Sequence, residues 1–201
     1  MYGKIKDHLT KEIQDIKESG LYKEERIITS MQGAEITLST GQTVLNFCAN
    51  NYLGLSSHPD VIQAAKDTMD THGFGMSSVR FICGTQDIHK ELEQKIADFY
   101  QTEDTIWYAA AFDANGGVFE PLLTKEDAII SDSLNHASII DGCRLARART
   151  LVYPHCDHVA LAEIMEREKS HRKGRWLIVT DGVFSMDGDV APLTELCDLK
   201  D

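Results

Sequence analysis

The chain has 201 residues, of which 42% are hydrophobic and 26% are charged, and its formal net charge is -12. This balance is typical of an ordinary folded protein and argues against disorder. Nucleic-acid binding usually needs a concentrated basic face, so we expect no nucleic-acid partner. No apolar run approaches the roughly 18 to 20 residues of a membrane span, and the first residues lack the apolar core of a signal peptide. We therefore expect no membrane segment and a cytoplasmic location.

Five cysteines are scattered along the chain without any C-x-x-C pair: Cys48, Cys83, Cys143, Cys156 and Cys197. Their odd number and spacing indicate neither a disulfide framework nor a zinc knuckle. Residues 155–158, HCDH, offer two imidazoles and a thiol but lack a second pair of ligands. We therefore predict no metal site.

The first 58 residues combine one helix with short strands. Residues 3–19 repeat isoleucine or leucine at helical spacing between charged residues, which predicts an amphipathic helix. Alternating runs at 26–29, 35–38 and 43–47, with turns at Gly33 and Gly41, predict a small antiparallel meander. We expect residues 1–58 to form an N-terminal arm and part of a small lobe.

From residue 59 onward, stretches with helical spacing alternate with short apolar runs. The expected helices cover 59–72, 86–99, 114–123, 137–147, 158–170 and 192–199, and the expected strands cover 104–109, 127–131, 149–153 and 176–181. Apolar strands separated by helices indicate a mainly parallel sheet covered on both faces, so the predicted class is α/β. The last helix should lead into another strand, so we expect 59–201 to be the first part of an incomplete large domain.

A turn of small residues follows the strand expected at 104–109 and opens a helix. The first amides of a helix lack intrahelical partners and point outward at the positive end of its dipole, which favours a bound phosphate. Ala111 allows close approach, and Phe112 offers an apolar surface beside it. A plain turn from strand to helix explains this segment equally well.

Two further strand ends carry polar side chains. His136 lies where the strand expected at 127–131 gives way to a helix, which is where open α/β sheets bind ligands, and its imidazole can lie against an aromatic ring. Ser185 follows the strand expected at 176–181 and presents a hydroxyl at the same edge. A phosphate cradle, a stacking ring and a hydroxyl donor together are what pyridoxal 5'-phosphate (PLP) needs, so we predict this cofactor.

Two residues outside these strand ends are candidates for substrate binding. Asn50 lies in a loop before the helix at 59–72 and could bind a carboxylate, although an asparagine there is more often a capping or turn residue. Arg80 lies in a glycine-rich stretch, residues 73–85, whose simple interpretation is a surface loop. A charged arginine in an apolar setting usually has an anionic partner, which favours a functional role.

Three segments resemble the α-oxoamine synthases, which are fold type I, aminotransferase-like enzymes that use PLP. They are FDANGG at 112–117, LNHASIIDG at 134–142 and DGVFSMDG at 181–188, and the resemblance covers the whole chain. It implies that the amides of Ala111 and Phe112 hold the phosphate, that the catalytic residue His136 stacks on the ring and that Ser185 bonds the ring hydroxyl. It also implies that Asn50 and Ser131 lie near the substrate and that the enzyme is a homodimer.

The members that the chain resembles most join glycine to acetyl-CoA, giving 2-amino-3-oxobutyrate and CoA in threonine degradation. The family's remaining machinery, including the lysine that binds PLP covalently, lies further along the chain, and no lysine here has the desolvated setting that activates an amine. We therefore expect the amino-terminal half of such an enzyme, inactive alone and needing a complementing carboxy-terminal half. Two alternatives stay open: a noncatalytic truncated scaffold subunit, and a family member with a different acyl-CoA.

Overall fold

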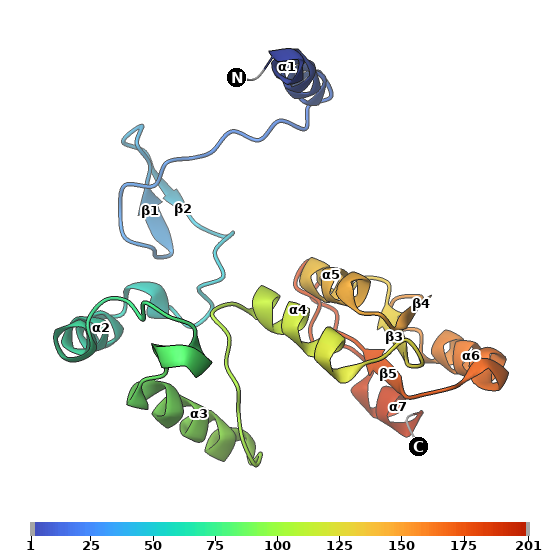
Figure 1. Ribbon diagram of the computed structural model, residues 1–201. Helices are drawn as coiled ribbons and strands as arrows, with labels where there is room; N and C mark the ends of the chain where they lie inside the picture. The colour runs from blue at the N-terminus through green and yellow to red at the C-terminus, as the bar shows by residue number, and fades with distance from the viewer. Residues whose placement is uncertain (1–2, 200–201) are drawn as a thin grey trace. The chain divides into compact units, whose positions relative to one another are not determined.

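The computed structural model describes residues 3–199 and divides the chain into two compact units (Figure 1). The first unit is Met1–Gly84 and the second is Thr85–Asp201. A compact unit need not coincide with a lobe of the complete enzyme, so the division into 1–58 and 59–201 stays a prediction. Among residues 3–199, none of the helices combines the length and apolar character that a bilayer span demands.

The first unit contains the expected helix and antiparallel strands. Helix α1 covers Gly3–Glu18, and strands β1 (Glu35–Thr37) and β2 (Thr43–Leu45) pair antiparallel with Ile36 opposite Val44. The strand expected at 26–29 is reduced to one antiparallel bridge between Ile28 and Leu38. The meander is therefore present, but its first strand is minimal.

Local sequence signals set the ends of helix α2, which covers Pro59–His72, the residues that the sequence predicts. His58 Nδ1 accepts the backbone N–H of Asp60 at 3.3 Å, and Pro59 is favourable in the first turn. The helix ends at Gly73, whose φ of 76° few other residues adopt easily. The short helical turns η1 (Leu55–Ser57) and η2 (Arg80–Gly84) flank α2 in sequence.

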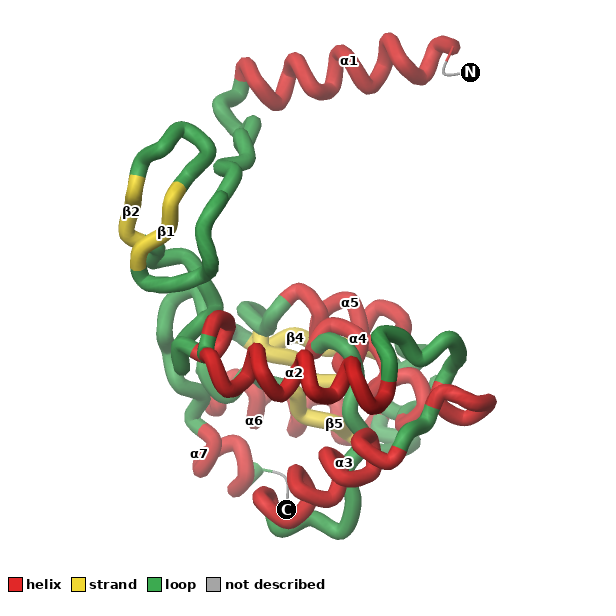
Figure 2. Tube along the Cα trace, turned by 90° about the vertical axis from the view of Figure 1, so that its left-hand side faces the viewer, coloured by secondary structure: helices red, strands yellow, loops and turns green. Residues whose placement is uncertain are grey.

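The second unit is a parallel sheet between helices (Figure 2). Its strands are β3 (Ala128–Asp132), β4 (Arg149–Tyr153) and β5 (Trp176–Val179), in the order β4-β3-β5. Its helices are α3 (Asp87–Tyr100), α4 (Ala111–Leu122), α5 (Ala137–Leu145), α6 (His158–Glu168), η3 (Lys169–His171) and α7 (Leu193–Asp198). Both pairings of β3 are parallel, which confirms the predicted α/β class.

The central strand β3 is buried at all five positions and alternates its side chains between two apolar clusters. Ile129 packs with Phe119 of α4 and Ile139 of α5, whereas Ile130 packs with Leu161 of α6 on the other face. Neither isoleucine is exposed to solvent. Helices therefore cover both faces of the sheet, and the polar carboxyl ends of the strands are left to form a site.

The prediction of a strand at 104–109 is wrong, because these residues form no strand within the part of the chain that is described. A strand needs a neighbour to bond with, and residues 104–109 pair with none of the three strands of this sheet. Trp107 stacks on His89 instead, with ring centroids 5.1 Å apart. Helix α4 then begins three residues earlier than predicted.

Candidate functional site

His136 is the N-cap of α5, immediately after the segment that leaves β3. Its Nδ1 lies 2.6 Å from the Ser138 hydroxyl oxygen and accepts the Ser138 backbone N–H at 3.2 Å. A side chain that caps its own helix in this way satisfies one of the free amides of the first turn. The imidazole is exposed, but these contacts restrict its orientation.

Asp181 joins the carboxyl ends of β3 and β5. Its Oδ2 accepts the backbone N–H of His136 at 2.7 Å, and its own N–H donates to Asn135 Oδ1 at 2.8 Å. The buried Asn135 amide donates in turn to Ser131 Oγ and to the carbonyl of Val179, both at 2.9 Å. The side-chain oxygen and nitrogen of the buried Asn135 are thus both paired, as buried polar groups require.

Helix α4 lies beside α5 and is hydrogen-bonded to its first turn. Asn115 Nδ2 donates to Ser138 Oγ at 2.9 Å, so one hydroxyl contacts both α4 and His136. A Cβ on Gly142 would come within 2.6 Å of the Asn115 carbonyl oxygen, which shows how closely the two helices pack. The N-cap residue Ala110 has no side-chain hydrogen bond to the first turn, so the amides of Ala111 and Phe112 keep the free character of a helix start.

A cavity of about 410 Å³ lies at the ends of β3 and β5. Its lining includes His136, Asp181 and Ser185, and ligand sites are typically roughly 300 to 1,000 Å³. The structure therefore brings together two of the residues that the sequence singles out, 49 positions apart. Ala111 and Phe112, both exposed, are not part of this lining.

None of the residues predicted to bind substrate is in the lining of this cavity. Ser131 is buried, and its hydroxyl donates to the Asp132 carbonyl at 3.2 Å and lines a separate cavity of about 250 Å³. Asn50 and Arg80 belong to the first compact unit, where Asn50 Oδ1 accepts the Tyr52 hydroxyl at 3.2 Å. Arg80 is half-buried at the start of η2.

Sequence reasoning missed Asp181 and Ser138 as parts of this site. The signal for Asp181 was its position directly after a buried strand, where a carboxylate can meet the free amides of a neighbouring helix. Ser138 gives no such signal, because its two partners lie on α4 and at the N-cap of its own helix.

The chain shares its sequence pattern and its fold with enzymes of one class. Residues 42–201 match the family model described as "Aminotransferase class I and II", so the chain belongs to that family. It is 58% identical over its whole length to 2-amino-3-ketobutyrate coenzyme A ligase of Escherichia coli strain K12, and it covers 50% of that protein. The mitochondrial protein of that name from Homo sapiens is 54% identical over 97% of the chain, which covers 46% of it.

A solved serine palmitoyltransferase from S. paucimobilis, with a bound PLP-myriocin aldimine, superposes with a TM-score of 0.86 at 31% identity. The match covers 96% of this chain and 48% of that one. These findings confirm the predicted fold type I architecture and the resemblance to α-oxoamine synthases. The chain spans about half the length of the curated relatives it matches.

Proposed function

We propose that the protein carrying this chain is a PLP-dependent glycine C-acetyltransferase, which condenses glycine with acetyl-CoA to 2-amino-3-oxobutyrate and CoA. The identity of 58% along the whole chain to 2-amino-3-ketobutyrate coenzyme A ligase supports this proposal. The structural observation that carries it is the shared cavity of His136 and Ser185 at the carboxyl ends of two parallel strands. Open α/β sheets bind their ligands at this edge.

Residues of the second unit offer the groups that PLP needs. The uncapped first turn of α4 leaves the amides of Ala111 and Phe112 to bind the phosphate group. The imidazole of His136, held by Ser138, offers a flat surface for the pyridine ring. Ser185, which lines the same cavity as His136, would supply the hydroxyl for the ring oxygen.

When bound, PLP supplies an electron sink that stabilises negative charge on the α-carbon of glycine. The role of the residues of this chain is to bind the cofactor and to orient it. Asp181 fixes the backbone of His136, and Asn135 keeps the ends of β3 and β5 at one spacing. Such preorganisation lets the site hold the reacting groups without rearrangement during the reaction.

Asn50, Ser131 and Arg80 are the residues that we propose for contacts with substrate, and a second copy of the protein is the partner that we propose. The hydroxyl of Ser131 already contacts Asn135, so its contribution to substrate binding would pass through that amide. The cytoplasm is the proposed location, although relatives from mammals bear names that specify mitochondria.

The test is an assay of CoA release by the purified full-length protein. With PLP present, we expect release from acetyl-CoA that requires glycine, and slower release from propionyl-CoA and succinyl-CoA. The His136→Ala variant should lose most of this activity and the Ser133→Ala variant, altered at an exposed position, should keep it. Release that does not depend on glycine, or a preference for another acyl donor, would contradict the proposed reaction.

A further inference from the structure

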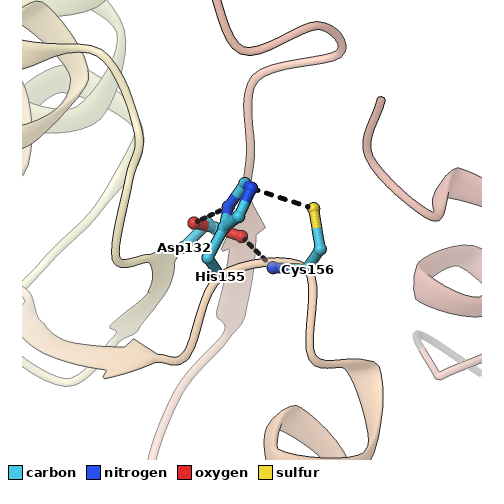
Figure 3. A group of neighbouring side chains, drawn as sticks. All are labelled: Asp132, His155 and Cys156. Carbon is cyan, nitrogen blue, oxygen red and sulfur yellow. Dashed lines mark hydrogen bonds and ion pairs between the residues drawn. The ribbon is translucent and has the colours of Figure 1, made fainter. Parts of the chain in front are cut away.

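The buried carboxylate of Asp132 organises the loop that follows β4. Asp132 is the last residue of β3, and its side chain is only 1% exposed. Its Oδ1 accepts the backbone N–H of Leu134 at 2.8 Å and lies 3.0 Å from His155 Nδ1. Its Oδ2 accepts the backbone N–H of Cys156, a bond drawn as a dashed line in Figure 3, and the two atoms are 2.8 Å apart. One carboxylate thus joins the segment that leads to His136 with the segment that carries His155.

The other side of the His155 ring faces the turn that contains Ser185. Its Nε2 lies 3.2 Å from Asp189 Oδ2, and its ring meets the Phe184 ring edge-on with centroids 4.3 Å apart. Phe184 and Asp189 are themselves joined, because the Phe184 N–H donates to the Asp189 carbonyl at 2.8 Å. His155 therefore holds both ends of the short segment within which Ser185 lies.

We propose that His155 is a positioning residue of the cofactor site, which ties the turn carrying Ser185 to the end of β3 and so keeps the Ser185 hydroxyl in place for PLP. This inference rests on the proposed function, since PLP is the ligand that Ser185 would bind. His155 itself does not line the cavity of His136 and Ser185, so its effect on the cofactor passes through Phe184 and Asp189.

The electrostatics of the cluster agree with this role. Each ring nitrogen of His155 faces a carboxylate, and only a protonated ring can donate to both. The bond to Asp132 raises the pKa of His155 most, Asp189 raises it further, and burial opposes them. Cys156 is a further titratable neighbour, with its Sγ 3.5 Å from His155 Nε2, and burial raises the pKa of its thiol.

The same residues form a group with metal-ligand chemistry, because ligand-type atoms of Asp132, His155 and Cys156 lie within 4.8 Å of one another. Hydrogen bonds account for this group without an ion. Both oxygens of Asp132 already accept backbone N–H groups. The raised pKa of the Cys156 thiol also disfavours the thiolate that binds metals.

The test compares His155→Phe with the wild-type full-length protein. Phenylalanine keeps an aromatic ring against Phe184 but removes both hydrogen bonds. In the cofactor-free protein, we expect the amides of Phe184 and Gly188, which are bonded across the turn, to exchange hydrogen about tenfold faster. We also expect PLP, titrated by absorbance, to bind about tenfold more weakly.

A second variant and a double variant separate positioning from general destabilisation. Asp189→Ala alters a side chain that is 58% exposed, so the fold should persist. Amide exchange in the turn should become faster and PLP binding weaker, as in His155→Phe. Ser185→Ala should weaken PLP binding less in the His155→Phe background than in the wild type. The reason is that a displaced Ser185 hydroxyl bonds PLP more weakly, so its removal costs less binding free energy. His158→Phe, at the start of α6, is the matched control and should leave both readouts unchanged.

The proposal for His155 is overturned if His155→Phe lowers the melting temperature but leaves amide exchange in the turn and the Ser185→Ala effect as in the wild type. Equal effects of His155→Phe and His158→Phe would overturn it too. Failure of the proposed function is a separate result, because a wild-type protein that binds no PLP would still show faster exchange in the cofactor-free His155→Phe variant if the inference about the turn is correct.

Discussion

The carboxylate of Asp181 accepts the backbone N–H of His136 at 2.7 Å, so a side chain that follows β5 fixes the residue that opens α5. This bond spans 45 residues of sequence and lies in the lining of the cavity that also contains Ser185. A charged acceptor on a backbone amide makes a strong hydrogen bond. The position of the His136 ring therefore depends on the end of a different strand.

Substitution of Asp181 should weaken cofactor binding in graded steps. Asp181→Asn can keep an oxygen acceptor for the His136 amide but loses the charge, whereas Asp181→Ala loses both. Hydrogen bonds to charged groups contribute about 1.5–3 kcal/mol, so we expect PLP to bind the alanine variant about ten- to a hundredfold more weakly. Absorbance titration of the full-length protein measures this, and an alanine variant that binds PLP like the wild type contradicts the role of Asp181.

Ser138→Ala should disturb both the imidazole and helix α4. The substitution removes the oxygen that lies 2.6 Å from His136 Nδ1 and accepts the Asn115 amide, and it leaves that amide without this partner. A typical hydrogen bond contributes about 0.5–1.5 kcal/mol, so urea unfolding should show a loss of about this size. Ser133→Ala at an exposed position serves as the control, and equal losses in the two variants would argue against the shared hydroxyl.

Gly142→Ala should destabilise the contact between α4 and α5. The added Cβ would lie 2.6 Å from the Asn115 carbonyl oxygen and 2.8 Å from the Phe119 ring. Overpacking of this kind costs about 1–3 kcal/mol in the free energy of unfolding. Gly116→Ala is a matched control, because its Cβ meets nothing within 4 Å and alanine favours a helix. A loss in the Gly116 variant as large as in the Gly142 variant would refute the steric explanation.

The His155 cluster predicts a dependence of stability on pH. The folded pKa of His155 is raised, chiefly by Asp132, so its charge stabilises the fold fully below the unfolded value of about 6.5. This stabilisation is lost as pH rises through the folded pKa. Between about pH 6 and pH 9, the wild-type free energy of unfolding should therefore fall more than that of His155→Phe. Parallel pH profiles of the two proteins would show that the ring carries no charge in the fold.

Local signals in the sequence predicted the helices better than the strands. Helix α2 has the predicted ends, because a capping histidine, a proline in the first turn and a terminal glycine are adjacent in sequence to the structure they cause. The strand expected at 104–109 is absent from the described residues. The prediction failed because an apolar run does not reveal whether a neighbouring strand is available. Strand formation depends on partners remote in sequence.

The same distinction applies to the site. That His136 and Ser185 would approach each other could be predicted, because the carboxyl ends of parallel strands share an edge. The bonds from Asp181 to the His136 backbone and from His155 to Asp132 and Asp189 could not be predicted, since each joins residues 23 to 45 positions apart. Sequence reasoning accordingly treated His155 as incidental, whereas the structure places it between two carboxylates.

The most direct test is a crystal structure of the full-length protein with PLP. We expect the pyridine ring on the imidazole of His136, the ring oxygen within hydrogen-bond distance of the Ser185 hydroxyl and the phosphate at the amides of Ala111 and Phe112. PLP bound at another place, or held with His136 and Ser185 both out of contact, would contradict the assignment of this sheet edge as the cofactor site.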